Sequence, residues 1–298
     1  MSTQDLSGKV IVITGASSGF GRGASVQFAK AGASVVLAAR RGHVLDDVAR
    51  ECEAAGGLAL AVPTDVSKEG EVEALAQAAL AKFGRIDIWV NNAGGGALGR
   101  FEEVPLADHV QVIETDLLGT LYGSYRAMQQ FHKQQSGVLI NVASVIGKIP
   151  APYFASYAAA KHGVVGLSGA IRQELSVNDV KNIHVCTVMP TSMDTPFFEH
   201  AANYTGHKAV PIPPVYDPQE VVDVIVRLAT KPEAEVVVGA AGVASAISHN
   251  LAPHMTEAMM AKQTHAAQME KAPAAGDTDG SILEPMLTGV GVSGGLRR

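Results

Sequence analysis

The chain of 298 residues has little cysteine, little charge and no long apolar run. Its two cysteines, Cys52 and Cys186, stand in no CxxC or Cys/His spacing, so the sequence gives no sign of a zinc site or a disulfide framework. We expect both to be buried thiols in a reducing compartment. No segment approaches the roughly 18 uninterrupted apolar residues that a membrane span requires, and residues 1–9 contain no apolar signal core. The sequence therefore predicts a cytoplasmic protein with no membrane span and no metal site.

The balance of charge narrows the range of partners. Only 17% of the residues are charged and 47% are hydrophobic, so the chain can bury one large core and need not divide into two domains. The formal net charge of -6 provides no basic field that would attract a phosphate backbone. Nucleic acid is therefore not an expected partner.

The first structural pattern is a β-branched run at 10–13, followed by a glycine-rich turn at 14–21 and a helix that continues to Gly32. The run is typical of a strand buried on both faces of a parallel sheet. Glycines in such a turn let a diphosphate approach backbone N–H groups at the start of the helix. The alternative is an ordinary strand-to-helix turn. If the turn binds a dinucleotide, the residues in contact with it are Gly15, Ser17, Ser18, Gly19, Phe20 and Gly21.

The second strand, at 34–39, indicates which dinucleotide is bound. An acidic residue at its end would accept hydrogen bonds from a free ribose, but Ala39 stands there, followed by Arg40 and Arg41. An arginine can pair with a 2′-phosphate, so NADP is favoured over NAD. Alternatively, the two arginines only begin a solvated helix. Asp65 and Val66 follow the third strand, where a side chain could meet the adenine edge.

Strands and helices continue to alternate along the chain. We expect helices at 43–55, from Ser67 as N-cap to Phe83, and at 106–134, and strands at 58–62, 86–90, 138–142, 183–188 and 235–238. A further helix carries Tyr157 and Lys161 four residues apart on one face. A fixed ammonium near a phenol lowers the pKa of the phenol, which would let Tyr157 exchange protons near neutrality. By spacing alone, such a pair is usually an ordinary surface pair.

Taken together, these motifs resemble the short-chain dehydrogenase/reductase family over roughly residues 7–240. The resemblance rests on TGxxxGxG at 14–21, Asp65-Val66, Asn91-Asn92-Ala93-Gly94, Ser144, the YxxxK helix, and Pro190 with Thr195. It implies a doubly wound α/β fold with a seven-stranded parallel sheet, in one domain spanning residues 1–240.

The same resemblance implies the roles of the site residues. Tyr157 would be the general acid/base, and Ser144 would hold the substrate oxygen. Lys161 would bind the nicotinamide ribose, Thr195 the carboxamide, and Asn92, Ala93 and Gly94 the inner ribose. The implied reaction is NADPH-dependent reduction of a carbonyl, or the reverse oxidation of an alcohol. A homotetramer or dimer is also implied, joined through helices whose outer faces include Leu121, Tyr125, Val165 and Leu167.

Two residues depart from the family pattern. Asp116 stands where many relatives have asparagine, and its charge should oppose the effect of Lys161 on Tyr157. Thr191 replaces a common glycine and could narrow the nicotinamide site or only change the local turn. Because of Asp116, a non-catalytic NADP-binding regulator that reports redox state is kept as the alternative to an enzyme.

The substrate site and the C-terminal region are the least constrained. A lid at about 192–214 and the flanking segments would give an apolar or aromatic pocket; its expected members are Gly95, Gly96, Ile149, Tyr153, Phe154, Phe197 and Phe198. Beyond residue 240 we expect a helical extension (241–298) broken near Pro253, whose apolar stripe either closes the pocket or covers a partner subunit. Residues 272–298 are expected to form a flexible tail, and His249, His254 and His265 to lie on the surface.

Overall fold

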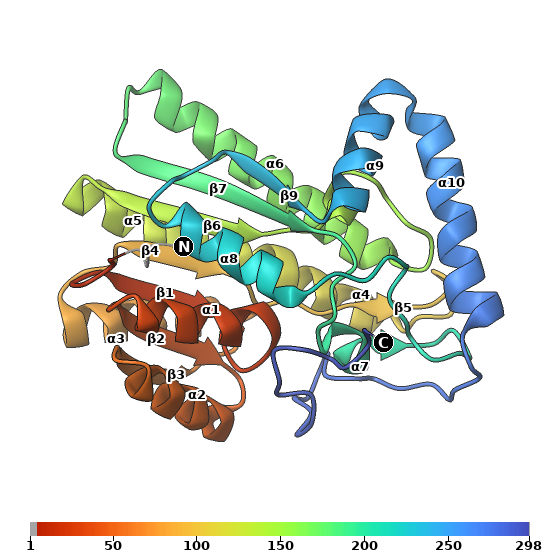
Figure 1. Cartoon of the computed structure of the whole chain (residues 1–298), viewed down its shortest axis with the longest axis horizontal. Helices are drawn as coiled ribbons and strands as arrows, with labels where there is room; N and C mark the ends of the chain where they lie inside the picture. Colours follow the sequence, from red (N-terminus) through yellow and green to blue (C-terminus); the bar gives the residue numbers. More distant parts are fainter. Residues whose placement is uncertain (1–4, 298) are drawn as a thin grey trace.

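The computed structural model describes residues 5–297 and is built around a parallel sheet of seven strands in the order β3-β2-β1-β4-β6-β7-β9 (Figure 1). The strand order reverses between β1 and β4, so the carboxyl ends of these strands border the crevice where such folds bind ligands. This is the doubly wound fold that the sequence predicts. The strands are β1 (Val10–Thr14), β2 (Ser34–Ala39), β3 (Leu58–Pro63), β4 (Ile88–Asn91), β6 (Gly137–Val142), β7 (Ile183–Pro190) and β9 (Glu235–Val238).

Helices cover both faces of the sheet, which explains why β1 and β6 are buried along their whole length. One face packs against α1 (Gly19–Lys30), α2 (Gly42–Ala54) and α8 (Pro218–Leu228). The other packs against α3 (Glu69–Phe83), α5 (Gly119–Gln134) and α6 (Ala155–Val177). Helix α8 follows Asp217, whose carboxylate caps the helix by accepting a hydrogen bond from the Gln219 N–H.

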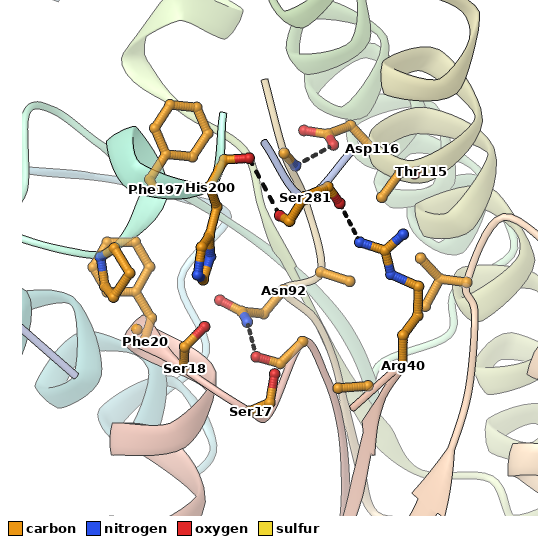
Figure 2. A pocket seen from close by; sticks show the side chains of 18 of the residues that line it. Ser17, Ser18, Phe20, Arg40, Asn92, Thr115, Asp116, Phe197, His200 and Ser281 are labelled. Carbon is orange, nitrogen blue, oxygen red and sulfur yellow. Dashed lines mark hydrogen bonds between the residues drawn. The ribbon is translucent and has the colours of Figure 1, made fainter. Parts of the chain in front are cut away.

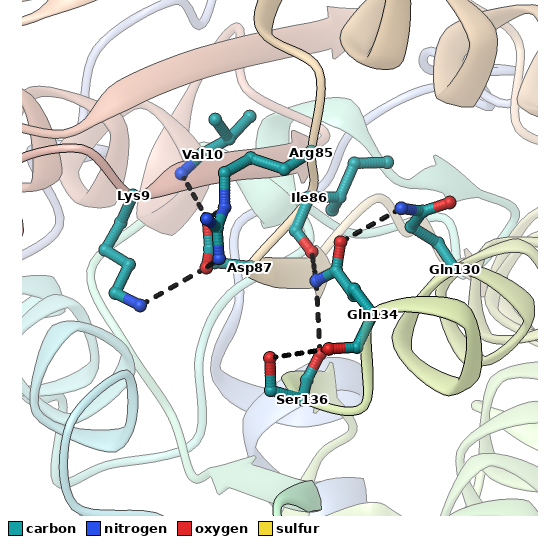
Figure 3. Close-up of polar contacts among 8 residues, drawn as sticks. All are labelled: Lys9, Val10, Arg85, Ile86, Asp87, Gln130, Gln134 and Ser136. Carbon is teal, nitrogen blue, oxygen red and sulfur yellow. Dashed lines mark hydrogen bonds and ion pairs between the residues drawn. The ribbon is translucent and has the colours of Figure 1, made fainter.

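The amino-terminal edge of the sheet is closed by polar contacts around Asp87 (Figure 3). Its buried carboxylate accepts hydrogen bonds from the Val10 N–H and from Arg85, and lies 3.3 Å from Nζ of Lys9. The Gln134 side chain donates to the carbonyls of Ile86 and Ser136 nearby. These contacts fix β1 against β4 at the edge opposite the crevice.

The long helix expected at 106–134 is interrupted. The structure has α4 (Leu106–Ile113), a π-helical turn (Glu114–Leu118) and then α5. The wide turn contains Asp116, which is fully buried. Such turns are frequent at functional sites.

The expected N-cap of α3 was wrong by one residue. Lys68 occupies the N-cap position, and the Ser67 hydroxyl instead donates to the Asp65 carboxylate at 2.8 Å. The Glu71 carboxylate accepts the Asp65 N–H at 2.7 Å. Asp65 and Ser67 therefore form a turn that precedes the helix.

The C-terminal extension consists of α9 (Ala240–Leu251) and α10 (Pro253–His265), followed by a π-helical turn (Ala266–Lys271). The two helices project from the edge of the sheet as a hairpin that breaks at Pro253 (Figure 1). Its apolar stripe is mostly outside the core, because Ile247, Leu251 and Met255 are 57%, 82% and 69% exposed. Of the three expected surface histidines, His254 is almost fully exposed and His249 lies beside Glu257.

Residues 272–297, expected to be flexible, instead lie against the body of the protein. Short antiparallel bridges join Thr278 to Asn203 and Ala274 to His207. Asn203 belongs to β8 (Ala202–Asn203), which pairs with β5 (Ala97–Leu98) in a second small sheet. The segment then crosses the carboxyl edge of the large sheet, where arginine side chains provide donors for its carbonyl groups.

Residues 5–297 also show the state of the two thiols and the exposure of the outer helix faces. Both cysteines are buried, and burial raises the pKa of each thiol to about 12. In this range no helix combines the length and apolarity needed to cross a membrane, and no group of His, Cys, Asp and Glu side chains could hold a metal. Leu121 and Tyr125 are 40% and 55% exposed, and the proposed homotetramer stays a prediction.

Candidate active site

Two cavities meet at the carboxyl ends of the strands. The turn-side cavity, of about 200 Å³, lies beside the glycine turn (Figure 2). The lid-side cavity, of about 160 Å³, lies beside the 192–214 segment. Tyr157, Phe20, Thr195 and Phe197 line both. A molecule in one cavity can therefore meet a molecule in the other at Tyr157.

Four polar side chains gather at this junction from three separate elements. Tyr157 and Lys161 come from α6, Ser144 follows β6, and Asp116 comes from the π-helical turn. Nζ of Lys161 lies 3.0 Å from the Asp116 carboxylate and donates to the Val142 carbonyl at 3.2 Å. Lys161 is only 3% exposed and Asp116 not at all, so the pair is an ion pair in the protein interior. The surface-pair interpretation of Tyr157 and Lys161 does not fit this burial.

Burial and charge act together on these groups. Burial raises the pKa of the Tyr157 phenol above its ordinary value; the nearby Lys161 cation lowers it, and the Asp116 carboxylate raises it. Burial alone would lower the pKa of Lys161, but Asp116 and Tyr157 raise it above its ordinary value. Lys161 therefore stays protonated, and Asp116 weakens its effect on the phenol.

The end of β4 approaches this ion pair closely. The Gly95 N–H donates to the Asp116 carboxylate at 2.8 Å. A Cβ atom on Gly94 would lie 3.0 Å from Oδ2 of Asp116 and 3.2 Å from Nζ of Lys161. Glycine at this position therefore lets the backbone reach the pair without displacing either group.

The glycine turn is held against the end of β4. Gly15 has φ +67°, and a Cβ on it would lie 2.8 Å from Cα of Ala93, so a larger residue does not fit. The Asn92 side chain donates to the carbonyls of Thr14 and Gly15 at 3.0 and 3.2 Å. Helix α1 then begins at Gly19, with its first N–H groups at the cavity.

Arg40 and Arg41 follow β2 and both line the turn-side cavity. Arg41 is buried, and its guanidinium donates to Oγ of Ser17 at 2.9 Å and to Oγ of Ser18 at 3.1 Å. Arg40 donates to backbone carbonyls of residues 281–283, as Figure 2 shows for Ser281. The two cations thus face the cavity and do not serve only to begin a solvated helix.

The lid-side cavity is apolar apart from hydroxyl and amide groups. The described residues that line it include none with a charged side chain. The lid contributes Met193 and Phe198, and α9 and α10 contribute Ser245 and Met260. The extension therefore closes this cavity on one side, but with residues outside the predicted apolar stripe, whose Ile247, Leu251 and Met255 are exposed. Thr191 also lines the cavity, and a Cβ on Gly239 would meet its Cγ2 at 2.3 Å.

Most of the predicted site residues line one of the two cavities, although Gly95, predicted for the substrate pocket, lines the turn-side cavity. Four predicted site residues line neither cavity. Gly21 packs beneath the turn and Gly96 behind Phe197. Ile149 is fully buried in the protein. Tyr153 turns away: its hydroxyl lies 2.7 Å from Nδ1 of His265, and it thereby anchors α10.

Other lining residues were not foreseen. His200 and residues Ser281, Pro285 and Met286 belong to the turn-side cavity. His200 follows the Phe197-Phe198 pair of the lid, which is the only sequence signal for it. Nothing in the composition of the C-terminal segment indicates its place.

Comparison with known proteins decides the family. The family model described as short chain dehydrogenase matches residues 9–204. The chain belongs to the short-chain dehydrogenase/reductase family. It is also 36% identical to 3beta-hydroxysteroid dehydrogenase 1 of Eggerthella lenta, over 73% of this chain and 85% of that protein.

Solved structures agree with this assignment. A short chain dehydrogenase/reductase from Burkholderia phymatum in complex with NAD is 26% identical, with a TM-score of 0.76 over 86% of this chain and 96% of that one. An alcohol dehydrogenase from Thermococcus sibiricus, complexed with 5-hydroxy-NADP, is 26% identical, with a TM-score of 0.66 over 77% of this chain and 95% of that one. The present family member is thus an oxidoreductase acting on CH–OH or C=O groups, and these two structural neighbours are complexed with nicotinamide cofactors.

Proposed function

We propose that this enzyme uses NADPH to reduce the carbonyl group of a neutral, apolar small molecule, and catalyses the reverse oxidation of the secondary alcohol. The observation that supports this most is the position of Tyr157. It lines both cavities, with Ser144 at the lid side and the buried Lys161 at the turn side. A proton donor is therefore available where the two cavities meet.

The residues of the turn-side cavity fit a nicotinamide dinucleotide. The N-terminus of α1 and the glycine turn suit a diphosphate. Arg40 and Arg41, with Ser17 and Ser18, suit a 2′-phosphate. Asp65 and Val66 would border the adenine, and Asn92, Ala93, Gly94 and Lys161 the inner ribose; Pro190 and Thr195 would contact the nicotinamide end. When bound, the cofactor supplies the hydride.

The protein's own contribution is to position the carbonyl and move a proton. Ser144 and Tyr157 would hold the carbonyl oxygen, and the phenol would donate its proton as charge develops on that oxygen. Lys161 stabilises the resulting phenolate, since it is a buried cation whose Nζ lies 5.5 Å from the centre of the Tyr157 ring. In the reduction, one carbonyl, one NADPH and one proton give one alcohol and one NADP⁺.

The proposed substrate class follows from the lid-side cavity. The described residues that line this cavity include no charged side chain that could pair with a charged metabolite. The free-energy cost of removing water from such a metabolite would therefore not be offset. Phe154, Phe197 and Phe198 suit an apolar or aromatic ring instead. The steroid substrate named for the Eggerthella lenta relative is consistent with this class.

The rival proposal is a non-catalytic NADP-binding regulator, favoured only by Asp116. A panel of ketones, assayed by NADPH consumption, separates the two proposals. It contains neutral cyclic, aromatic and aliphatic ketones, and charged oxoacids serve as the comparison set. We expect turnover with the neutral set and little with the oxoacids. A chain that binds NADPH but reduces no ketone would support the regulator.

The first testable prediction concerns cofactor choice. Since Ala39 offers no carboxylate to a ribose and two arginines face the cavity, NADPH should bind more tightly than NADH by about 1.5–3 kcal/mol, the contribution of one charge-assisted contact. Titration of protein fluorescence with each nucleotide measures this difference. Arg40→Ala should reduce the preference for NADPH over NADH, because only NADPH loses a phosphate contact, whereas the lost contacts of Arg40 with residues 281–283 affect both nucleotides alike. Equal dissociation constants in the wild type, or an unaltered ratio of the two constants in Arg40→Ala, would remove the assignment.

The second prediction concerns Asp116. Its negative charge, 3.0 Å from Lys161, raises the pKa of Tyr157. Asp116→Asn should therefore lower the apparent pKa for alcohol oxidation, by roughly half a unit to one unit. The pH profile of the oxidation rate provides the measurement, with circular dichroism and NADP binding as controls for folding. A pKa that stays fixed or rises in a folded variant would show that the carboxylate does not act on the phenol.

A further inference from the structure

A stretch of the C-terminal segment, residues 281–291, crosses the turn-side cavity; it is called the strap here. Ser281, Pro285 and Met286 line the cavity together with Arg40 and Gly19. Ile282 is only 6% exposed, and its Cδ1 would lie 3.1 Å from a Cβ on Gly95. The strap therefore reaches from the arginines to the end of β4 inside the same cavity.

The backbone carbonyls of the strap accept hydrogen bonds from the two guanidinium groups of this cavity, which are charged donors. Arg40 donates to the carbonyls of Ser281, Ile282 and Leu283. Arg41 donates to the carbonyl of Met286 at 3.1 Å and to that of Thr288 at 2.9 Å. Oxygen acceptors thus already satisfy both guanidinium groups.

A third contact involves the N-terminus of α1. The Gly19 N–H donates to the Gly291 carbonyl at 2.9 Å, and Arg22 donates to the Val290 carbonyl at 2.8 Å. The free N–H groups at a helix N-terminus preferentially donate to a negatively charged oxygen. The strap carbonyl therefore takes the place that a phosphate oxygen would take.

We infer that the strap is an internal ligand of the cofactor cleft, and that NADPH binds after displacing it. This inference rests on the proposed function, which assigns Arg40, Arg41 and Gly19 to the phosphates of the cofactor. One N–H group cannot fully serve a carbonyl and a phosphate oxygen at the same position. The available space agrees, because the cavity of about 200 Å³ is smaller than the roughly 300–1,000 Å³ typical of ligand sites.

The contacts on both sides of the strap allow it to leave without unfolding the protein. Upstream, Thr278 remains paired with Asn203. Downstream, the Asp194 carboxylate accepts hydrogen bonds from the Ser293 hydroxyl and from the N–H groups of Gly294 and Leu296. The strap is thus tethered at both ends, which keeps its effective concentration at the cleft high.

The size of the effect depends on the fraction of molecules with the cleft open. The apparent dissociation constant equals the intrinsic constant divided by that fraction. A strap closed in about nine molecules in ten raises the constant roughly tenfold. Removing the strap should lower the dissociation constant of NADPH by that factor.

The test compares NADPH binding by the full chain with binding by a chain that ends at Gly280. A second variant, Gly280→Ala, keeps the full length: Gly280 has φ +55°, and a Cβ on it would lie 2.3 Å from the His200 carbonyl oxygen, so alanine should push the strap out of place. Gly276→Ala is the matched control, because no atom lies within 4 Å of a Cβ there. We expect roughly tenfold tighter NADPH binding in the first two variants and no change in the control.

Hydrogen exchange gives the direction of the movement independently of affinity and of turnover. On addition of NADPH to the full chain, the amides of Ser281 and Ile282, which donate to the carbonyls of His200 and Asp279, should lose protection. A gain of protection would show that the strap closes over the cofactor, and unchanged or weaker binding in both folded variants would show that it does not compete; either result overturns the inference. If neither the full chain nor the shortened chain binds NADPH, the proposed cofactor itself is wrong, and NADPH does not compete with the strap for the cleft.

Discussion

Tyr157→Phe is expected to abolish nearly all turnover while the enzyme still folds and binds NADPH. The substitution removes only the hydroxyl that would exchange a proton with the substrate oxygen. Loss of a general acid typically lowers a rate by about 10²–10⁴-fold. Because the ring remains in contact with Phe154 and Phe197, the packing around residue 157 should survive. Steady-state kinetics and NADPH titration of the same preparation provide the measurement.

Tyr153→Phe is the matched control for this experiment. It also removes one phenol hydroxyl, but that hydroxyl contacts His265 and lies outside both cavities. We expect the control to keep most of its turnover. Substantial activity in Tyr157→Phe would assign the proton donor to another group.

The second large effect is expected on stability, for Lys161→Met. Methionine keeps most of the side-chain volume but removes the ammonium that faces the fully buried Asp116 carboxylate. Removing one partner of a buried ion pair typically costs about 3–5 kcal/mol of unfolding free energy. Turnover and NADPH affinity should fall as well, since in the proposed function the same ammonium would serve the phenol and the ribose. Urea unfolding followed by fluorescence of Trp89, the one tryptophan of the chain, measures the stability.

The loss of stability in Lys161→Met should depend on pH with a defined sign. Burial raises the pKa of Asp116 in the folded state, and Lys161 is the main charge that opposes this. A folded-state pKa above the unfolded value favours folding when the group is protonated, so the variant should regain stability as the pH falls through the raised pKa. The double variant with Asp116→Asn should lose this dependence. A Lys161→Met protein as stable as the wild type at neutral pH would contradict the buried ion pair.

Local patterns in the sequence predicted the individual strands, and the family resemblance implied the seven-stranded sheet that the structure has. The β-branched run at 10–13 and the glycine turn after it are local signals, because strand and turn propensities act over few residues. The YxxxK spacing likewise places Tyr157 and Lys161 on one face of a single helix. The family's order of motifs then implied the remaining members of the site, and the structure brings Ser144, Tyr157, Lys161 and Asp116 together.

The features that the sequence did not reveal depend on contacts between distant segments. The strap is held mainly through its backbone carbonyls, a group that every residue has. The composition of residues 272–298, rich in glycine, alanine and polar residues, indicated flexibility instead. Its partners, Arg40 and Arg41, lie more than two hundred residues earlier. Similarly, the π-helical turn at Glu114–Leu118 surrounds Asp116, whose partner Lys161 belongs to another helix. The spacing of apolar residues within 106–134 therefore does not indicate the Asp116–Lys161 ion pair.

The most direct test of the proposed function follows an isotope from the cofactor to the product. The protein is incubated with a neutral ketone that it consumes and with NADPH carrying deuterium at the transferable position, and the alcohol is analysed by mass spectrometry. We predict one deuterium on the carbinol carbon for each NADPH consumed, and no labelled alcohol from Tyr157→Phe on the same timescale. Unlabelled alcohol, or NADPH that binds without reducing any ketone of the panel, would contradict the proposed reductase.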